Sequence, residues 1–95
     1  MKTLVNKVTE IDKGNGEKIK FSDFAESCIN HTPKEGYSVA EMKARLNVLG
    51  KIDHEKETIE LEDAEADKLA ECVAVMPWAI MHKDVVEFSD AVKEM

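Results

Sequence analysis

The sequence predicts an α+β fold that is mainly helical, with an N-terminal β-hairpin and one further short strand packed against about four helices. Two observations predict the strands and helices. Polar and apolar residues alternate near the N-terminus and again at residues 57–61, at the period of two that is typical of strands. Elsewhere, apolar residues recur at steps of three and four, the period of amphipathic helices. The length of 95 residues fits a single domain spanning 1–95.

The hairpin is predicted by two segments, 3–11 and 16–21, that carry apolar or β-branched residues at a loose period of two. Between them, residues 12–16 include two glycines and an asparagine, which accept the positive φ angles of tight turns. The later strand at 57–61 is predicted to pair with this hairpin.

The turn has an alternative interpretation, as the start of a calcium-binding EF-hand loop. Such a loop needs oxygen ligands at alternate positions and a glycine at the sixth. Here glycines take the third and fifth positions, and Glu17 takes the sixth. Only Asp12 and Asp23 fall on ligand positions, so we reject calcium and retain the hairpin turn.

The first two helices are predicted from the residues that begin and end them. The first begins at Ser22 or Asp23 and ends at about His31, because the residue before Pro33 avoids helical geometry. The second begins at Ser38, where Ser-Val-Ala-Glu has the pattern of a capping box, and a glycine ends it.

The third helix begins at Asp63 and is interrupted by Pro77, and the last runs from about Asp84 to the C-terminus. Apolar spacing predicts the sides of the helices that point into the core. These are, in chain order, Phe24, Cys28 and Ile29; Val39, Met42, Leu46 and Leu49; Ala66, Leu69, Cys72 or Val73, and Met76; and Val85, Phe88, Val92 and Met95.

Charge is divided unevenly between the two halves of the chain. Residues 1–51 carry nine basic and seven acidic side chains, whereas residues 52–95 carry four and thirteen, most densely at 55–71. The negative electrostatic field of this acidic half disfavours direct binding to nucleic acid or an anionic membrane. It favours a basic protein partner or simple solubility. The acidic run therefore has two interpretations: a solvated surface, or a mimic of nucleic-acid charge that blocks a basic groove on a host enzyme.

Cys28 and His31 are the candidate residues for metal binding or thiol chemistry, because they lie one helical turn apart. Structural zinc needs four ligands, and the other candidates, Cys72, His54 and His82, are scattered along the chain. No third group orients a Cys–His pair for nucleophilic catalysis. We therefore expect a non-enzymatic protein with no cofactor, no metal site and two reduced, buried thiols.

An aromatic residue and a terminal stripe are further candidates for binding a partner. Trp78, beside Pro77, is either buried at a kink or exposed as an interface anchor. The apolar stripe of the last helix, Val85, Phe88, Val92 and Met95, either packs in the core or forms the contact surface of a homodimer. The candidate partner-binding residues are Glu60, Glu62, Asp63, Glu65, Asp67, Trp78, Val85, Phe88 and Val92.

Residues 14–95 resemble small bacteriophage and prophage proteins of unassigned role. The resemblance is carried by the segment Gly16–Phe21 before the first helix, Lys51-Ile52 after the second, the segment Ile59–Glu65 at the start of the third, and a short closing helix. It implies a compact accessory or assembly protein of the host cytoplasm and supplies no catalytic residues. Cytoplasmic residence is also expected because no segment reads as a signal peptide or a membrane span.

Overall fold

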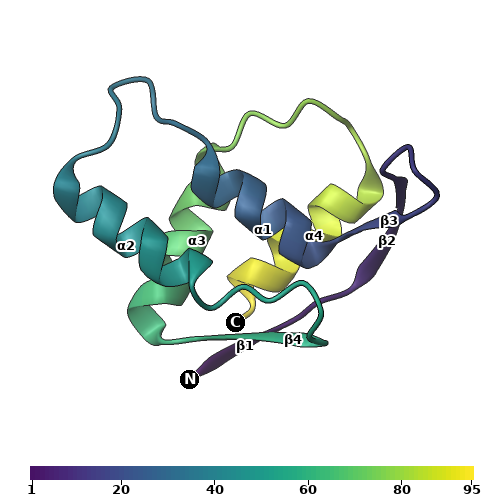
Figure 1. Ribbon diagram of the computed structural model, residues 1–95, viewed down its shortest axis with the longest axis horizontal. Coiled ribbons are helices and arrows are strands. Elements are labelled where there is room, and N and C mark those ends of the chain that lie inside the picture. Colours follow the sequence, from purple (N-terminus) through teal and green to yellow (C-terminus); the bar gives the residue numbers. More distant parts are fainter.

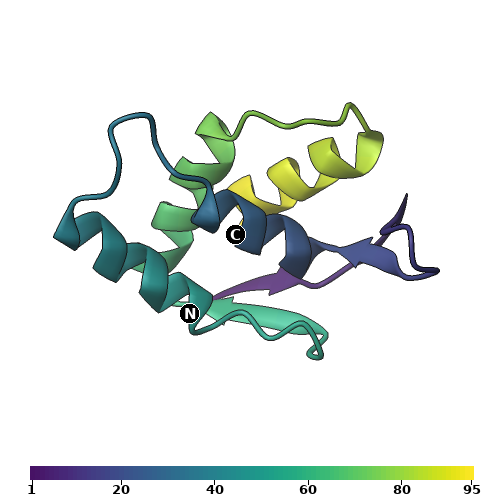
Figure 2. The same cartoon turned by 45° about the horizontal axis from the view of Figure 1, so that its top comes forward.

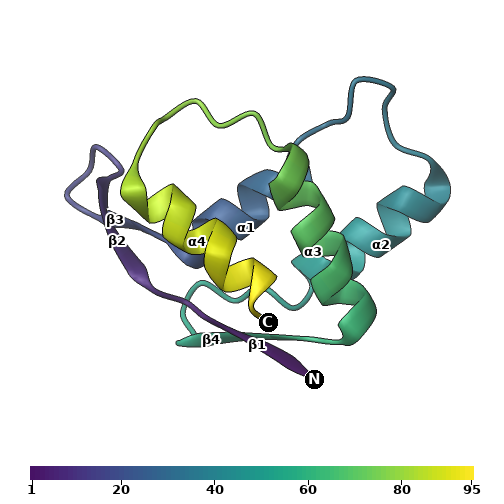
Figure 3. The same ribbon diagram turned by 180° about the vertical axis from the view of Figure 1, so that it is seen from behind.

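The computed structural model describes residues 1–95 and has an α+β architecture, roughly half helical, with four helices and four short strands. Figures 1 and 3 show two helices on each side of the molecule, α1 and α2 opposite α3 and α4. No helix combines the length and apolar content that crossing a membrane needs. The elements are β1 (Lys2–Val5), β2 (Val8–Asp12), β3 (Lys18–Lys20), α1 (Phe21–Asn30), α2 (Val39–Leu49), β4 (Thr58–Leu61), α3 (Asp63–Val75) and α4 (Lys83–Lys93).

The strands form two separate antiparallel pairs rather than one sheet. β2 pairs with β3 across the predicted turn. This confirms the hairpin for residues 8–12 and 18–20, which lie next to the turn. β1 instead pairs with β4, with Lys2 opposite Leu61 and Val5 opposite Thr58. Figure 2 shows this pair beneath the helices and the β2–β3 hairpin projecting at the end away from α2. The strand predicted at 57–61 is therefore present and pairs with the first part of the predicted strand 3–11, but it does so in a separate sheet and not as a third strand of the hairpin.

Asn6 explains why residues 3–11 form two strands instead of one. It lies between β1 and β2 and is buried. Its amide oxygen accepts from the backbone N–H of Ser22 at 2.8 Å, and its amide nitrogen donates to the carbonyl of Lys56 at 3.0 Å. A buried polar group needs such partners, and these lie on α1 and on the loop before β4, so the chain changes direction at Asn6.

The turn between β2 and β3 has the predicted geometry. Gly14 and Gly16 adopt φ angles of +93° and +87°, in a region that side chains rarely occupy. The Asp12 carboxylate accepts from the Gly14 N–H at 3.2 Å, and the Lys13 N–H donates to the Glu17 carbonyl at 2.8 Å. Local hydrogen bonds therefore close the turn.

The residues that cap α1 and α3 precede the predicted ones. Lys20 precedes α1, and the Asp23 carboxylate accepts from its N–H at 2.8 Å. At the start of α3, Glu65 accepts from the N–H of Glu62 at 2.8 Å. Ser38 begins α2 as predicted, accepting from the N–H of Glu41 at 3.1 Å. Each interaction satisfies a backbone N–H that has no partner within the helix.

The core is a single cluster to which the β1–β4 pair and all four helices contribute. Trp78 and Phe24 form a T-shaped pair with ring centroids 5.3 Å apart, and Phe21 packs on Phe88 at the same separation. Burying one such side chain stabilises the fold by about 1.5–3 kcal/mol. The buried apolar residues are Leu4, Phe21, Phe24, Ala25, Cys28, Ile29, Val48, Ile59, Leu61, Ala66, Leu69, Cys72, Val73, Val85, Phe88 and Val92.

The predicted inward side of α2 is wrong for three of its four residues. Val39, Met42 and Leu46 are 69%, 44% and 62% exposed, and only Leu49 is packed against the core. Arg45 and Val48 are buried instead. The helix is therefore rotated relative to its apolar spacing, with an arginine facing inward and three large apolar side chains facing outward.

Candidate functional site

The exposed apolar side of α2 is the first candidate site. We call Val39, Met42 and Leu46 the α2 face, because steps of three and four place them on one side of the helix. Beside it runs a groove of about 250 Å³ between the end of α1 and α2. Most of its lining is apolar, and no lining residue is acidic. The groove is lined by Ile29, Asn30, Tyr37, Met42, Arg45, Leu46 and Leu49.

Arg45 lines this groove and also holds α1 and α2 together. Its Nη1 donates to the carbonyl oxygens of Ile29 at 2.8 Å and His31 at 2.9 Å, both at the C-terminal end of α1. Its guanidinium carbon lies 5.0 Å from the centre of the Tyr37 ring. Because the last carbonyls of a helix have no partner within it, the inward arginine satisfies groups that would otherwise be unpaired.

A chain of ion pairs continues from Arg45 onto α3. The Glu41 carboxylate accepts from Arg45 Nε and from Lys68 Nζ, each at 2.9 Å. Hydrogen bonds from Lys68 and Arg45 lower the pKa of Glu41. Lys68 also lies 3.3 Å from Glu71. Glu41 therefore points between α2 and α3, and the outer side of α2 carries no carboxylate.

The predicted acidic residues lie on β4 and at the start of α3. Ile59 and Leu61 point into the core, so the intervening and following glutamates of this segment point outward. Four of the predicted acidic residues are exposed: Glu60, Glu62, Asp63 and Asp67. None of the four takes part in an ion pair within the chain, and we call them the acidic surface.

Glu65 differs from the other predicted acidic residues. Its side chain is 14% exposed, and its carboxylate accepts from the N–H of Glu62 and from Lys51 Nζ at 3.3 Å. These contacts fix the start of α3 and join it to the end of α2. We therefore assign Glu65 a structural role and leave it out of the acidic surface.

The predicted aromatic and terminal candidates lie in or against the core. Val85, Phe88 and Val92 are buried, which corresponds to core packing and corrects the alternative of a terminal docking stripe. Trp78 is half-buried against Phe24 and Phe88. Beside it, however, Met81 is fully exposed in the loop before α4, a feature that sequence spacing did not indicate.

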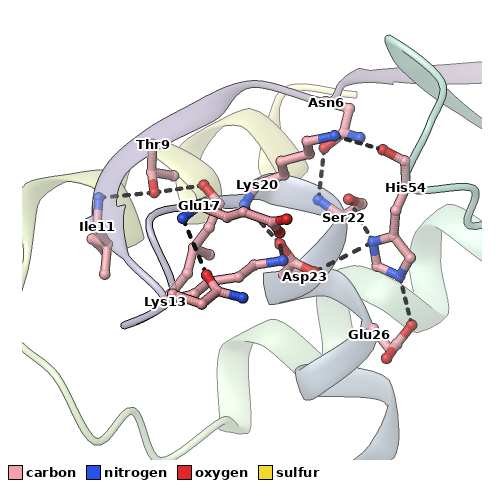
Figure 4. Close-up of polar contacts among 12 residues, drawn as sticks. Asn6, Thr9, Ile11, Lys13, Glu17, Lys20, Ser22, Asp23, Glu26 and His54 are labelled. Carbon is pink, nitrogen blue, oxygen red and sulfur yellow. Dashed lines mark hydrogen bonds and ion pairs between the residues drawn. The ribbon is translucent and has the colours of Figure 1, made fainter.

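His54 forms the centre of a polar network that sequence reasoning missed. Figure 4 shows its ring between side chains of α1. Nδ1 lies 2.8 Å from Ser22 Oγ and 3.4 Å from an Asp23 oxygen, and Nε2 lies 2.7 Å from Glu26 Oε2. In addition, Lys20 Nζ donates to the carbonyl of His54 at 3.0 Å. The loop before β4 is thereby held against the start of α1.

The serine, histidine and glutamate in this network invite comparison with a catalytic triad. A nucleophilic serine must reach a substrate, with the acid orienting the histidine from its other nitrogen. Ser22 is fully buried in the first turn of α1, where its N–H also donates to Asn6. The geometry therefore supports a structural clamp between loop and helix rather than an acyl-transfer site.

The thiols are placed unfavourably for reactivity. Burial raises the pKa of Cys28 from 9.0 to about 12 and also raises the pKa of Cys72. Both line a hollow of about 220 Å³ together with the exposed His31. A reactive cysteine needs a lowered pKa, because the thiolate is both the nucleophile and the metal ligand. These environments favour the protonated thiol.

Another group of potential metal ligands joins β2 to α4. Ligand atoms of Glu10, His82 and Asp84 lie within 4.8 Å of one another. The Asp84 carboxylate accepts from the Glu10 N–H at 2.9 Å, His82 Nδ1 accepts from the Asp84 N–H at 3.0 Å, and Lys83 pairs with Glu10 at 3.2 Å. These contacts account for the cluster as the N-terminal cap and anchor of α4.

Comparisons with models of protein families, with curated proteins and with solved structures found no match for this chain.

Proposed function

We propose that this chain is a small, non-enzymatic protein-interaction module that binds its partner through the α2 face. The observation that carries the proposal is the exposure of Val39, Met42 and Leu46 on one side of a well-anchored helix. Single exposed apolar residues are ordinary, but a group of them beside a groove is typical of interaction sites. The resemblance to small phage and prophage proteins supports an accessory or assembly role.

The energetics of the α2 face favour association. An apolar side chain of this size gains about 1.5–3 kcal/mol when it is fully removed from water, and this gain is not realised within the chain. A partner that covers the face would recover part of it. The ordering cost of binding is low, because Ser38, Arg45 and Glu41 already hold α2 in place.

Affinity capture with matched charge variants tests the proposal. Leu46→Asp places a carboxylate within the α2 face, whereas Asn47→Asp adds the same charge at the adjacent exposed position. We expect a host-extract protein to be retained by the wild type and by Asn47→Asp and to be lost with Leu46→Asp. Circular dichroism checks that both variants are folded. Equal retention by both variants would reject the α2 face as the docking site.

A second candidate function is mimicry of nucleic-acid charge by the acidic surface, which would block a basic groove on a host enzyme. The specific observation in its favour is that Glu60, Glu62, Asp63 and Asp67 form no ion pair within the chain. Such binding should weaken steeply between low and high salt, whereas binding through the α2 face should not. Displacement of DNA from a host enzyme, lost on Glu62→Lys with Asp67→Lys, would favour mimicry over the first proposal.

A further inference from the structure

Asn15 and Gly16 lie in the turn between β2 and β3 and form the only Asn-Gly pair of the chain. We propose that Asn15 is a site of spontaneous modification: the backbone nitrogen of Gly16 attacks the side-chain amide, ammonia is released, and water converts the product to aspartate or isoaspartate. The proposal rests on the exposure of the turn, on its hydrogen bonds and on the free space around Gly16. It is independent of the binding function proposed above.

The nucleophile of this reaction is left free by the fold. The Gly16 N–H donates to no acceptor within the chain, and both Asn15 and Gly16 are exposed. Gly16 has no side chain to obstruct the approach, and no atom lies within 4 Å of the position that a Cβ would take. Water can therefore remove the proton of this N–H, and a succinimide ring can form without displacing a neighbouring group.

The electrophile is held and polarised by the next residue. Asn15 Oδ1 accepts from the Glu17 N–H at 3.1 Å, as asparagine side chains commonly do in turns. The ring that this bond closes contains both Asn15 Cγ and the Gly16 nitrogen, so the amide is folded back over the peptide unit that attacks it. Negative charge develops on Oδ1 as the new bond forms, and a backbone N–H that already points at this oxygen stabilises the charge.

The reaction balances with water as its only co-reactant. The Gly16 nitrogen gives its proton to water and bonds to Asn15 Cγ; the bond between Cγ and Nδ2 breaks, and ammonia leaves with a proton returned by water. Water then opens the succinimide. Cleavage between Cγ and nitrogen gives aspartate with the original main chain. Cleavage at the backbone carbonyl gives isoaspartate, in which the main chain passes through Cβ and Cγ.

The other asparagines of the chain lack this arrangement. Asn6 is buried, and both ends of its amide are hydrogen-bonded. Asn47 lies within α2, where backbone N–H groups bond inside the helix, and the side chain of Val48 after it is fully buried. Asn30 ends α1 and precedes a histidine, whose side chain crowds the attacking nitrogen. These residues therefore serve as internal controls for Asn15.

Isoaspartate at this position would weaken the contact between the hairpin and α1. It lengthens the main chain of a turn that is closed by the hydrogen bond from the Lys13 N–H to the Glu17 carbonyl at 2.8 Å. Lys13 in turn pairs with Asp23 of α1 at 3.3 Å. Figure 2 shows the hairpin at the end of the molecule away from α2, so the α2 face should be unaffected.

Ageing of the purified protein under mildly alkaline conditions, followed by peptide mapping with mass spectrometry, tests the proposal. We expect the peptide that contains Asn15 to gain the mass difference between an amide and a carboxyl group, at a rate that rises with pH. An isoaspartyl methyltransferase should transfer labelled methyl groups from S-adenosylmethionine to aged protein and not to fresh protein. Asn15→Gln should abolish this labelling, because the longer side chain closes a ring far more slowly. The matched control, Asn47→Gln, should leave the labelling unchanged.

The rate in the folded chain decides whether the turn itself promotes the reaction. We expect folded protein to be modified at least as fast as protein unfolded in guanidinium chloride, since the turn holds the reacting atoms together. Slower modification in the folded state, or equal modification of Asn6, Asn30 or Asn47, would overturn the proposal. Hydrogen exchange should accelerate at residues 8–20 of the aged protein and stay the same in α2. Unchanged exchange at 8–20 in fully modified protein would overturn the weakening of the hairpin contact.

Discussion

Arg45 Nη1 donates to the carbonyl oxygen of Ile29 at 2.8 Å and thereby joins the middle of α2 to the last turn of α1. This contact explains the orientation of α2. The unpaired carbonyls at the end of α1 need a donor, and the inward arginine supplies it. The three apolar residues of the α2 face are consequently left in solvent.

Removing this arginine should destabilise the fold substantially. Arg45→Ala leaves two carbonyls and one side of Glu41 without their donor, so we expect the free energy of unfolding to fall by about 2–4 kcal/mol. Urea unfolding followed by circular dichroism measures the change. Lys43→Ala, an exposed position two residues away, should stay within about 0.5 kcal/mol of the wild type. A loss below 1 kcal/mol for Arg45→Ala would contradict the role assigned to it.

Two leucines on different helices test which side of α2 is exposed. Leu69 is fully buried, whereas Leu46 is 62% exposed. Leu69→Ala should cost about 2–5 kcal/mol of unfolding free energy, because it opens a cavity in the core. Leu46→Ala should change it by no more than about 0.5 kcal/mol. Equal costs, measured in the same urea titration, would show that α2 packs as its apolar spacing predicted.

The His54 clamp should also contribute measurably to stability. His54→Ala removes the partners of Ser22 Oγ and Glu26, and we expect a loss of about 1–3 kcal/mol, because Ser22 is left buried and unpaired. Hydrogen exchange should accelerate at residues 53–57, where the loop is released. His31→Ala is the matched control, since the side chain of His31 is exposed. Similar exchange in the two variants would remove the basis for the clamp.

The pKa of Cys28 predicts slow thiol chemistry in the folded state. A pKa of about 12 leaves almost no thiolate at pH 8, so native protein should react with a disulfide reagent far more slowly than urea-unfolded protein. Because folding raises this pKa, Cys28 favours the folded state below pH 9, and the contribution declines as the pH rises from 9 to about 12. Rapid stoichiometric labelling of Cys28 without denaturant, located by mass spectrometry, would contradict its burial.

The helix boundaries and the hairpin turn could be predicted because their causes are local. Gly14 and Gly16 accept positive φ angles, Ser38 caps the helix that follows it, and Pro33 ends the region in which α1 can continue. Such signals act within a few residues, so they are visible in the sequence. The inward sides of α3 and α4 followed for a similar reason, since their apolar residues lie at helical spacing on one side.

The candidate sites depended on contacts that no local pattern encodes. The acidic surface was visible in composition, but the separation of Glu65 from it required the positions of Lys51 and Glu62. His54 meets Ser22 across 32 positions of sequence. Nothing in the immediate sequence of either residue specifies that meeting.

By itself, the sequence determined the class of the fold, the approximate elements and the uneven distribution of charge, since each follows from residue type and short-range spacing. Only the tertiary structure decided that β1 pairs with β4 and that α2 turns Arg45 inward. The physical reason is that buried polar groups must find partners wherever the chain brings them. In α2 this requirement outweighed the burial of three apolar side chains, and the resulting exposed face is the surface on which the proposed function depends.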